Sequence, residues 1–218
     1  MQNLPFDVPT TKALIFDMDG TVTHNIPYHD QSWVIWAEQE GLKYTKTELL
    51  AQAYGTIGEI TRRLFPDATP HERFERGERK EAIYRDLFRP HLAPLPGLIP
   101  FLEWARQQPL STAIATAGDA TNIAFTVDGL QIRKYFDVFL GSEDVAHGKP
   151  NPEVYLLTAQ RLEVDPRDCV AFEDSPPGVE AVRRAGMKCV VVNPMASREE
   201  YGDCSHVIKW MKDYSDLS

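Results

Sequence analysis

Five short runs of apolar, often β-branched residues are spaced along the 218 residues of the chain. The runs are continuous rather than alternating, which is typical of strands that are buried on both faces of a parallel sheet. Because helical patterns lie between most of the runs, we predict an α/β fold with a Rossmann-like parallel sheet and right-handed crossovers. The runs are Lys12–Phe16, Ser111–Ala115, Val138–Leu140, Cys169–Phe172 and Cys189–Val192, and Val207–Ile208 forms a weaker sixth.

Residues that commonly start or end helices support this pattern. Asn151 is a typical N-cap residue and Pro152 suits the first helical position, so a helix is expected to begin there. Gly186 directly follows another helical pattern, at the position where glycine commonly ends a helix. The predicted helices are Gly97–Gln107, a segment from Asp119 to about Asp128, Pro152–Leu162 and Gly178–Ala185.

One long segment breaks the alternation of strands and helices. Between residues 23 and 94 the pattern predicts helices and no strand, beginning with a helix from about His29 to Glu40. Capping boxes, in which a threonine is followed three residues later by a glutamate, mark further helix starts at Thr45/Glu48, Thr56/Glu59 and Thr69/Glu72. We therefore expect residues 1–22 and 95–218 to form an α/β core domain, and residues 23–94 to form a helical bundle inserted after the first strand.

Polar side chains follow four of the predicted strands. In open α/β sheets, ligands bind beyond the carboxyl ends of the strands, so these side chains are expected to face one crevice. Together they supply carboxylates, a hydroxyl group and an ammonium group. The segments are Asp17-Met18-Asp19-Gly20-Thr21, Thr116-Ala117-Gly118, Gly148-Lys149-Pro150 and Glu173-Asp174-Ser175.

This combination of groups indicates phosphoryl transfer. Clustered carboxylates repel one another, and a hard divalent cation such as Mg²⁺, which takes oxygen ligands, relieves the repulsion. Lys149 and Thr116 would then neutralise and hydrogen-bond the remaining phosphate oxygens. Gly20 permits a tight turn after the first strand, where exposed amide groups can hold an anion. The arrangement is typical of a carboxylate nucleophile that attacks phosphorus.

The same four segments resemble the motifs of the haloacid dehalogenase superfamily. The stretch that begins at Asp17 matches motif one, DxDGT; Thr116 matches the Ser or Thr of motif two; and Lys149 in GKPNPEVY matches motif three. The stretch that begins at Glu173 matches motif four, EDSxxGxxAxxxAGM. The helical insertion, which opens with Tyr28-His29-x-x-x-Trp33, resembles the cap domain of the β-phosphoglucomutase-like branch.

The resemblance implies roles for the carboxylates. Asp17 would attack phosphorus and become an aspartyl phosphate. Asp19 would protonate the leaving oxygen and later activate water, and such general acid–base help contributes about 10²–10⁴ in rate. The cofactor would be Mg²⁺, held by the Asp17 carboxylate, the Asp19 backbone carbonyl and Asp174, with Glu173 as a further ligand.

The resemblance also implies which residues bind the substrate. Thr116, Ala117 and Lys149 would hold the transferring phosphoryl group, and Lys149 would also anchor the carboxylates. His29 would approach Asp19 when the cap closes over the crevice. Substrate specificity would come from cap residues that face the crevice.

Other aromatic and charged residues are interpreted as structural. Trp33, Trp36, Phe101 and Trp104 recur at helical spacing and are expected in the core. A run of basic residues alternates with glutamates, and we interpret it as a solvent-exposed helix face. The basic residues of this run are Arg73, Arg76, Arg79 and Lys80.

Composition and charge limit the partners. The 23 Lys and Arg residues against 32 Asp and Glu residues give a formal net charge of −9, which disfavours a nucleic-acid binder. No stretch approaches the roughly 18–20 apolar residues of a membrane helix. The 3 cysteines lack metal-site spacing and predict a reduced, cytoplasmic protein. We expect a monomer whose partner is a small phosphorylated metabolite, with no nucleic acid and no membrane.

Several activities fit these residues. The leading hypothesis is an Mg²⁺-dependent phosphatase of a small phosphorylated metabolite such as a sugar phosphate. The alternatives are a β-phosphoglucomutase-type phosphomutase, an inorganic pyrophosphatase and, from a different class, a phospho-receiver switch. In the mutase branch a second phosphate clamp resembles Gly-x-x-Arg, but here the stretch reads Gly55-Thr56-Ile57-Gly58. Arg62 or Arg63, one helical turn further on, would have to replace the missing arginine.

Overall fold

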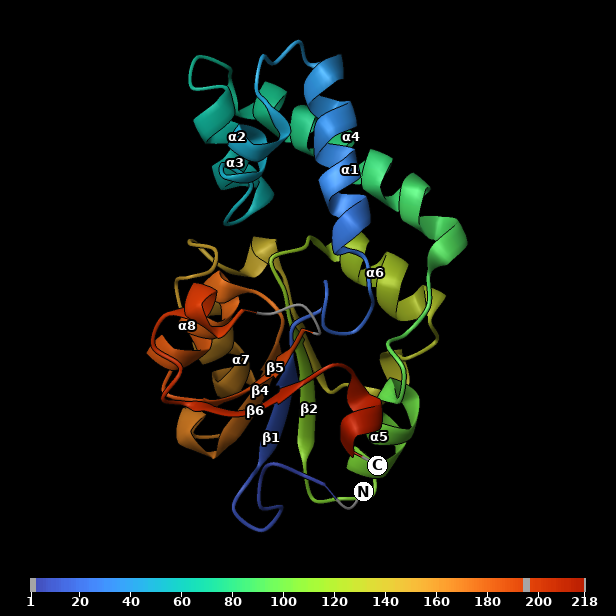
Figure 1. The fold of residues 1–218 in the computed structure, drawn as a ribbon, viewed down its shortest axis with the longest axis vertical. Helices are drawn as coiled ribbons and strands as arrows, with labels where there is room; N and C mark the ends of the chain where they lie inside the picture. Colours follow the sequence, from blue (N-terminus) through green and yellow to red (C-terminus); the bar gives the residue numbers. More distant parts are fainter. Residues whose placement is uncertain (1–2, 194–196, 218) are drawn as a thin grey trace.

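The computed structural model describes residues 3–193 and 197–217, and a six-stranded parallel sheet forms its centre (Figure 1). The strand order is β3-β2-β1-β4-β5-β6, so β1 lies in the middle of the sheet between β2 and β4. This architecture confirms the predicted Rossmann-like α/β fold. The strands are β1 (Ala13–Phe16), β2 (Ser111–Ala115), β3 (Val138–Leu140), β4 (Cys169–Glu173), β5 (Lys188–Val192) and β6 (Val207–Met211).

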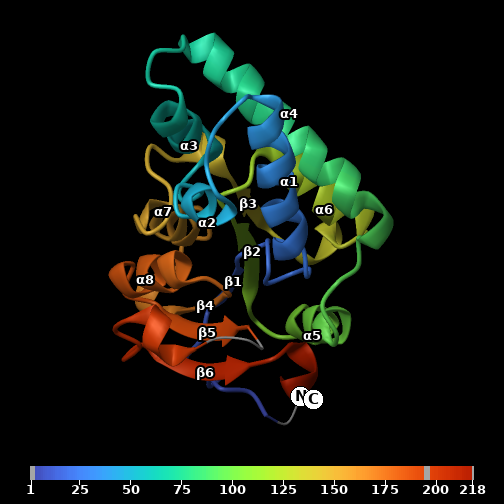
Figure 2. The same ribbon diagram turned by 45° about the horizontal axis from the view of Figure 1, so that its top comes forward.

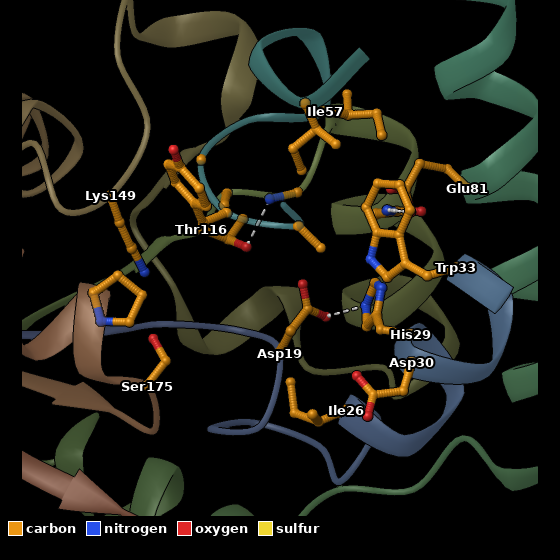
Figure 3. Close-up of a pocket in the computed structure, with 18 of the residues that line it drawn as sticks. Asp19, Ile26, His29, Asp30, Trp33, Ile57, Glu81, Thr116, Lys149 and Ser175 are labelled. Atoms are coloured by element: carbon orange, nitrogen blue, oxygen red, sulfur yellow. Dashed lines mark hydrogen bonds and ion pairs between the residues drawn. The ribbon is translucent and has the colours of Figure 1, made fainter. Parts of the chain in front are cut away.

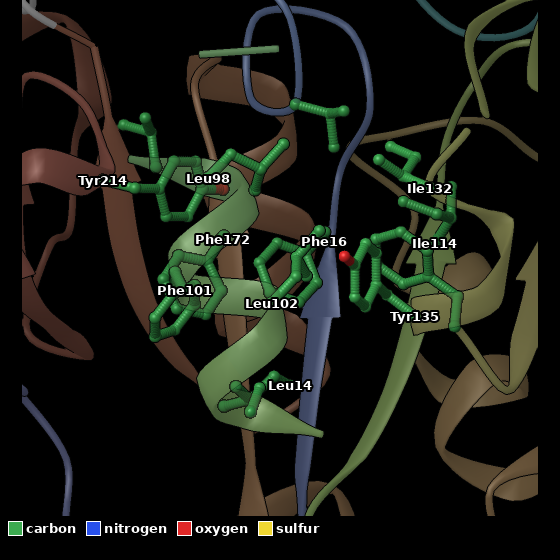
Figure 4. Packing of buried hydrophobic residues seen from close by; sticks show 14 of the residues in the cluster. Leu14, Phe16, Leu98, Phe101, Leu102, Ile114, Ile132, Tyr135, Phe172 and Tyr214 are labelled. Carbon is green, nitrogen blue, oxygen red and sulfur yellow. The ribbon is translucent and has the colours of Figure 1, made fainter. Parts of the chain in front are cut away.

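Helices cover both faces of the sheet because successive side chains of each buried strand point to opposite faces. In β1, Leu14 and Phe16 pack in one cluster with α5, while Ala13 and Ile15 pack in another with α7 and α8. Phe16 stacks on Phe172 of β4 with ring centroids 4.7 Å apart, at the centre of the first cluster (Figure 4). The core helices are α5 (Leu98–Ala105), α6 (Ala120–Gly129), α7 (Glu153–Arg161) and α8 (Pro176–Arg184).

Between residues 23 and 94 the chain is helical, as predicted, and these helices lie above the carboxyl ends of the strands (Figures 1 and 2). All of the predicted capping boxes are formed, since each threonine accepts a hydrogen bond from the amide of the glutamate three residues later. Trp33 and Trp36 form a small separate core with residues of the neighbouring helices. The helices are α1 (Ile26–Gln39), α2 (Lys46–Leu50), α3 (Ile57–Leu64) and α4 (Pro70–Phe88).

Two segments of the chain connect the sheet with the helical segment, and they are hydrogen-bonded to each other. Thr23 forms an antiparallel bridge with Pro94, and its hydroxyl donates to the carbonyl of Ala93 at 2.7 Å. The amide of Leu95 donates to the carbonyl of Val22 at 2.9 Å. The entry and exit of the helical segment therefore form one hydrogen-bonded pair.

Helix ends differ slightly from the predicted ones. Pro152 itself is the N-cap of α7, and the Asn151 side chain accepts from the amide of Glu153 at 3.0 Å. Gly186 follows α8 with a φ of 75°, as expected for a terminating glycine. Among the described residues, no helix is long and apolar enough to cross a membrane. Short 3₁₀ helices complete the fold: η1 (Arg89–His91), η2 (Arg133–Tyr135), η3 (Ser142–Asp144), η4 (Pro166–Asp168), η5 (Arg198–Tyr201) and η6 (Tyr214–Leu217).

Candidate active site

A cavity of about 300 Å³ lies between the carboxyl ends of the strands and the helical segment. Residues that follow β1, β2 and β4 line it from the sheet, and residues of α1, α3 and α4 line it from the opposite side (Figure 3). The structure therefore brings the predicted strand-end residues together in one place. Those that line the cavity are Asp17, Asp19, Thr116, Ala117, Lys149 and Asp174, and His29 joins them from α1.

Lys149 connects two of the buried carboxylates. Its Nζ donates to Asp17 Oδ1 at 2.5 Å, to Glu173 Oε1 at 2.6 Å and to the carbonyl of Ala115 at 3.2 Å. Burial disfavours the charged ammonium, but Asp17 and Glu173 outweigh this effect and raise the pKa of Lys149 above its ordinary value. Lys149 therefore stays positively charged and fixes the position of one Asp17 oxygen.

Glu173 is fully buried and surrounded by hydrogen-bond donors. Its Oε1 accepts from Lys149 and from the Tyr155 hydroxyl at 3.0 Å. Its Oε2 accepts from the amides of Asp174 and Ser175 at 2.8 and 3.0 Å, and from the Ser175 hydroxyl. Both oxygens are thus bound by protein groups, so in this arrangement Glu173 holds Lys149 in place.

The carboxylates form an oxygen-rich cluster that suits a divalent cation. Asp17, Glu173 and Asp174 each offer an oxygen, and these oxygens lie within 4.8 Å of one another. Lys149 pairs with Asp17 and Glu173, and Asp174 lies beside them, so one ammonium group faces an excess of carboxylates. Burial raises the pKa of Asp17 to about 8, with Lys149 opposing and Glu173 and Asp19 reinforcing the shift. An all-oxygen donor set with this excess charge fits Mg²⁺.

Gly20 makes room for one of these carboxylates. The residue has a φ of 82°, and a Cβ atom there would lie 2.0 Å from Asp174 Oδ2. Glycine is therefore required at this point both for the backbone conformation and for the close approach of Asp174. This explains why the turn that follows the strand end of Asp17 contains glycine.

Asp19 lies between Lys149 and His29 (Figure 3), and two side chains hold it. Asn25 Nδ2 donates to Asp19 Oδ1 at 2.5 Å, and His29 Nε2 lies 3.5 Å from the same oxygen. Burial acts to raise the pKa of Asp19, but His29 and Asn25 outweigh it and lower the pKa. The His29 ring stacks on Tyr84 of α4 with centroids 3.6 Å apart. His29 thus lies beside Asp19.

Lys80 contradicts the interpretation of a solvent-exposed basic helix face. Its side chain is buried, and Nζ lies 3.0 Å from His29 Nδ1 and 3.0 Å from Glu81 Oε1. Because an ammonium group only donates, Nδ1 of His29 accepts and its ring proton is placed on Nε2, facing Asp19. Arg76 and Arg79, from the same run, instead bind Glu40 of the helical segment.

Several site residues were not identified from the sequence. Asn25 and Lys80 support Asp19 and His29, while Tyr155 supports Glu173. A usable signal existed for Lys80, because it lies between Gly77 and Tyr84 on the stripe of α4 that is buried. The alternation of basic residues with glutamates along α4 made this buried stripe look like a solvent-exposed face.

Thr116 follows β2 and is buried beside the cavity. Its hydroxyl accepts a hydrogen bond from the amide of Gly118 at 3.0 Å. This bond closes a tight turn that places Thr116, Ala117 and Gly118 along one wall of the cavity.

The helical segment contacts the Lys149 loop directly. The amide of Gly148 donates to Glu59 Oε2 at 3.2 Å, and Glu59 also accepts from the amide of Thr56 at 2.8 Å. A Cβ atom on Gly148 would lie 2.6 Å from the Thr56 nitrogen. The first turn of α3 is therefore seated on the loop that carries Lys149.

Comparisons with known proteins identify the family of the chain. A family model of haloacid dehalogenase-like hydrolases matches residues 11–186. Fructose-1-phosphate phosphatase YqaB of Escherichia coli (strain K12) is 33% identical over 184 residues, which cover 83% of this chain and 95% of that protein. Hexitol phosphatase A of the same organism is 31% identical over 203 residues, which cover 90% of each chain.

A solved structure shows the same fold. β-Phosphoglucomutase from Clostridium difficile matches with a TM-score of 0.80 at 22% identity, covering 95% of this chain and 93% of that one. The six-stranded parallel sheet with helices on both faces is the Rossmann-like fold of that structure. The chain belongs to the haloacid dehalogenase-like hydrolase family.

Proposed function

We propose that this chain is an Mg²⁺-dependent phosphatase that hydrolyses a small sugar phosphate through an aspartyl phosphate. The observation that carries the proposal is the pair of aspartates in one cavity. Asp17 is fixed by Lys149 at 2.5 Å, and Asp19 faces the same cavity beside His29. The phosphatases of sugar and sugar-alcohol phosphates among the relatives support the substrate class.

In the first step, an oxygen of Asp17 attacks phosphorus. A new bond forms between this oxygen and phosphorus, and the ester bond between phosphorus and the sugar oxygen breaks. The negative charge of the bound phosphate favours the protonated form of Asp19, which donates its proton to the departing sugar oxygen. Thr116, Ala117 and Lys149 hold the phosphoryl group during the transfer, and His29 orients Asp19.

In the second step, water attacks phosphorus and hydrolyses the aspartyl phosphate. Asp19 is now a carboxylate and accepts a proton from the attacking water. The bond between Asp17 and phosphorus breaks, which releases inorganic phosphate and restores both aspartates. Asp17, Asp174 and the Asp19 backbone carbonyl would hold Mg²⁺, with Glu173 beside them. When bound, Mg²⁺ supplies positive charge that offsets the carboxylates and the phosphate oxygens.

The helical segment serves as a cap in this proposal. Residues 1–22 and 95–218 would form the core domain, and residues 23–94 would form a cap that encloses the substrate. Closure of a cap excludes water that would compete with the ordered steps. The contact between Glu59 and Gly148 supports this role, because it joins the cap to the Lys149 loop.

The residues that line the cavity favour a phosphatase over a phosphomutase. A mutase must hold a bisphosphate, and an arginine is suited to grip its distal phosphate. Arg63 instead donates to the carbonyls of Gln52 and Tyr54, and Arg62 lines a different cavity. Among the described residues, no arginine lines the cavity that contains Asp17.

Phosphate release and isomerisation can be measured in one assay. With β-glucose 1-phosphate and a catalytic amount of its bisphosphate, we expect inorganic phosphate to form with little glucose 6-phosphate. Because neither Arg62 nor Arg63 reaches the cavity, the bisphosphate would not be retained. Faster accumulation of glucose 6-phosphate than of phosphate would show that the chain is a mutase.

Cap closure can be tested at Gly148. Gly148→Ala places a methyl group against the backbone of Thr56, so we expect kcat/KM to fall by about tenfold or more through impaired closure. Thermal unfolding should change little, because the strain arises only where cap and core meet. The measurement is kcat/KM on a sugar monophosphate together with the unfolding midpoint.

Gly58→Ala is the matched control for this variant. Gly58 lies in α3, and the nearest atom to its added Cβ would be 4.0 Å away. Alanine is favoured over glycine in a helix by about 1 kcal/mol, so this variant should retain activity and stability. Equal activity of the Gly148→Ala and Gly58→Ala variants would contradict the role of the contact in closure.

A further inference from the structure

The cavity has an acidic side that the proposed reaction does not use. Glu81 and Asp119 line the cavity, and we call this pair the acidic wall. Figure 3 shows Glu81 and Lys149 on opposite sides of the cavity. Glu81 therefore lies away from the cation that would face the transferred phosphate, and Asp119 lines the same cavity.

Asp119 combines a helix cap with an unused acceptor. It is the N-cap of α6, and its Oδ1 accepts from the amide of Asn122 at 2.6 Å. The residue is 7% exposed, and its Oδ2 is buried without a hydrogen-bond partner among the described residues. A buried acceptor that is left unpaired is costly, so Oδ2 is suited to accept a hydrogen bond from a bound molecule.

Glu81 is held rigidly beside it. Asn122 Nδ2 donates to Glu81 Oε2 at 2.8 Å, while Lys80 donates to Oε1 at 3.0 Å. Arg85 in turn donates to Asn122 Oδ1 at 2.8 Å, which fixes the orientation of the amide. The acidic wall is thus a preformed surface of acceptors rather than a set of mobile side chains.

The cations of the cavity are already paired. Lys80 is bound to His29 and Glu81, and Lys149 is bound to Asp17 and Glu173. Over the part of the chain that the structure describes, these two are the lysines that line the cavity. Among the described residues that line the cavity, no unpaired lysine or arginine faces a second anionic group on the substrate.

We propose that the acidic wall selects substrates whose end remote from the transferred phosphate is neutral and carries hydroxyl groups. Hydroxyl groups donate to Asp119 Oδ2, whereas a second phosphate is repelled by the carboxylate of Asp119, which, unlike Glu81, has no ion pair among the described residues. The inference rests on the proposed phosphatase function and makes its substrate class narrower. Sugar and sugar-alcohol monophosphates are accepted, and sugar bisphosphates are rejected.

The test compares a monophosphate with its bisphosphate. For the wild type, we expect kcat/KM for fructose 1-phosphate to exceed that for fructose 1,6-bisphosphate by about tenfold or more. Asp119→Asn removes the charge but keeps a side chain that caps helices well. This variant should reduce the preference by about tenfold, mainly through a lower KM for the bisphosphate.

Asp86→Asn is the matched control, because it removes the same charge from an exposed position of α4. It should leave the ratio of the two substrates unchanged. Thermal unfolding checks that the Asp119→Asn protein is folded, and Asp119→Ser, also a capping residue, replaces it if it is not. An unchanged ratio in the folded Asp119 variant, or equal wild-type use of both substrates, would overturn the proposal.

A failure of the phosphatase function gives a different result. If neither compound is hydrolysed, the acidic wall is tested by binding, as the rise in unfolding midpoint caused by each compound. If fructose 1-phosphate raises the unfolding midpoint more than the bisphosphate does, and Asp119→Asn abolishes this difference, the proposed role of the acidic wall is supported. Equal rises with both compounds, or no rise with either, would overturn it independently of turnover.

Discussion

Asp17→Asn is expected to lower kcat by at least about a thousandfold, because an amide cannot attack phosphorus and residues that act as one unit fail together. Asn is similar in size to Asp and keeps a carbonyl oxygen that can accept from Lys149. Lys149 also retains its ion pair with Glu173 at 2.6 Å. The buried ammonium therefore stays paired, and the fold should be preserved.

The measurement is phosphate release from a sugar monophosphate at saturating concentration. Asp67→Asn, a substitution of an exposed residue remote from the cavity, is the matched control and should retain full activity. Residual turnover of Asp17→Asn above about 1% of the wild type would rule out an aspartyl phosphate on Asp17. Circular dichroism and thermal unfolding of both variants show whether a loss of activity reflects chemistry or unfolding.

Removal of the divalent cation is expected to have a similarly large effect. With excess EDTA, the rate of phosphate release should fall below about 1% of the rate with Mg²⁺. Without the cation, the carboxylates of Asp17, Glu173 and Asp174 would repel the phosphate group of the substrate. Added Mg²⁺ should restore the rate. Ca²⁺ should not restore it, because it prefers more ligands at longer distances and would misplace Asp17.

A variant separates the cation from other effects of the chelator. Asp174→Asn removes one charged ligand, so it should raise the Mg²⁺ concentration needed for half-maximal activity by about tenfold or more. Asp203→Asn, which changes a carboxyl that is exposed, serves as the control. Full activity in excess EDTA, or an unchanged Mg²⁺ requirement in Asp174→Asn, would contradict the role assigned to the carboxylate cluster.

Local rules account for much of what the sequence predicts correctly. A capping box is complete within four residues, so Thr45, Thr56 and Thr69 could each be assigned as a helix start without knowledge of the fold. The strand ends could be brought together because the parallel order of strands places their carboxyl ends at one edge. Asp17 and Lys149, far apart in the sequence, meet at 2.5 Å for this reason.

Other contacts depend on how helices pack, which periodicity does not specify. Lys80 alternates with glutamates as an exposed residue would, yet the packing of α4 against α1 buries it beside His29. Tyr155 reaches Glu173 only because α7 lies against the sheet at that height. The seating of α3 on Gly148 depends on the relative position of the helical segment and the core, which no local pattern contains.

The paired connecting segments at Thr23 and Pro94 restrict how the helical segment can turn. A domain attached by a single segment can rotate about several axes. Two connecting segments that are hydrogen-bonded side by side form a strip, and such a strip bends more easily than it twists. The same strip continues to the site, because Asp19 forms a bridge with Thr23. Bending of the strip would therefore move the backbone of Asp19, so the proposed proton-transfer group and the helical segment would move together.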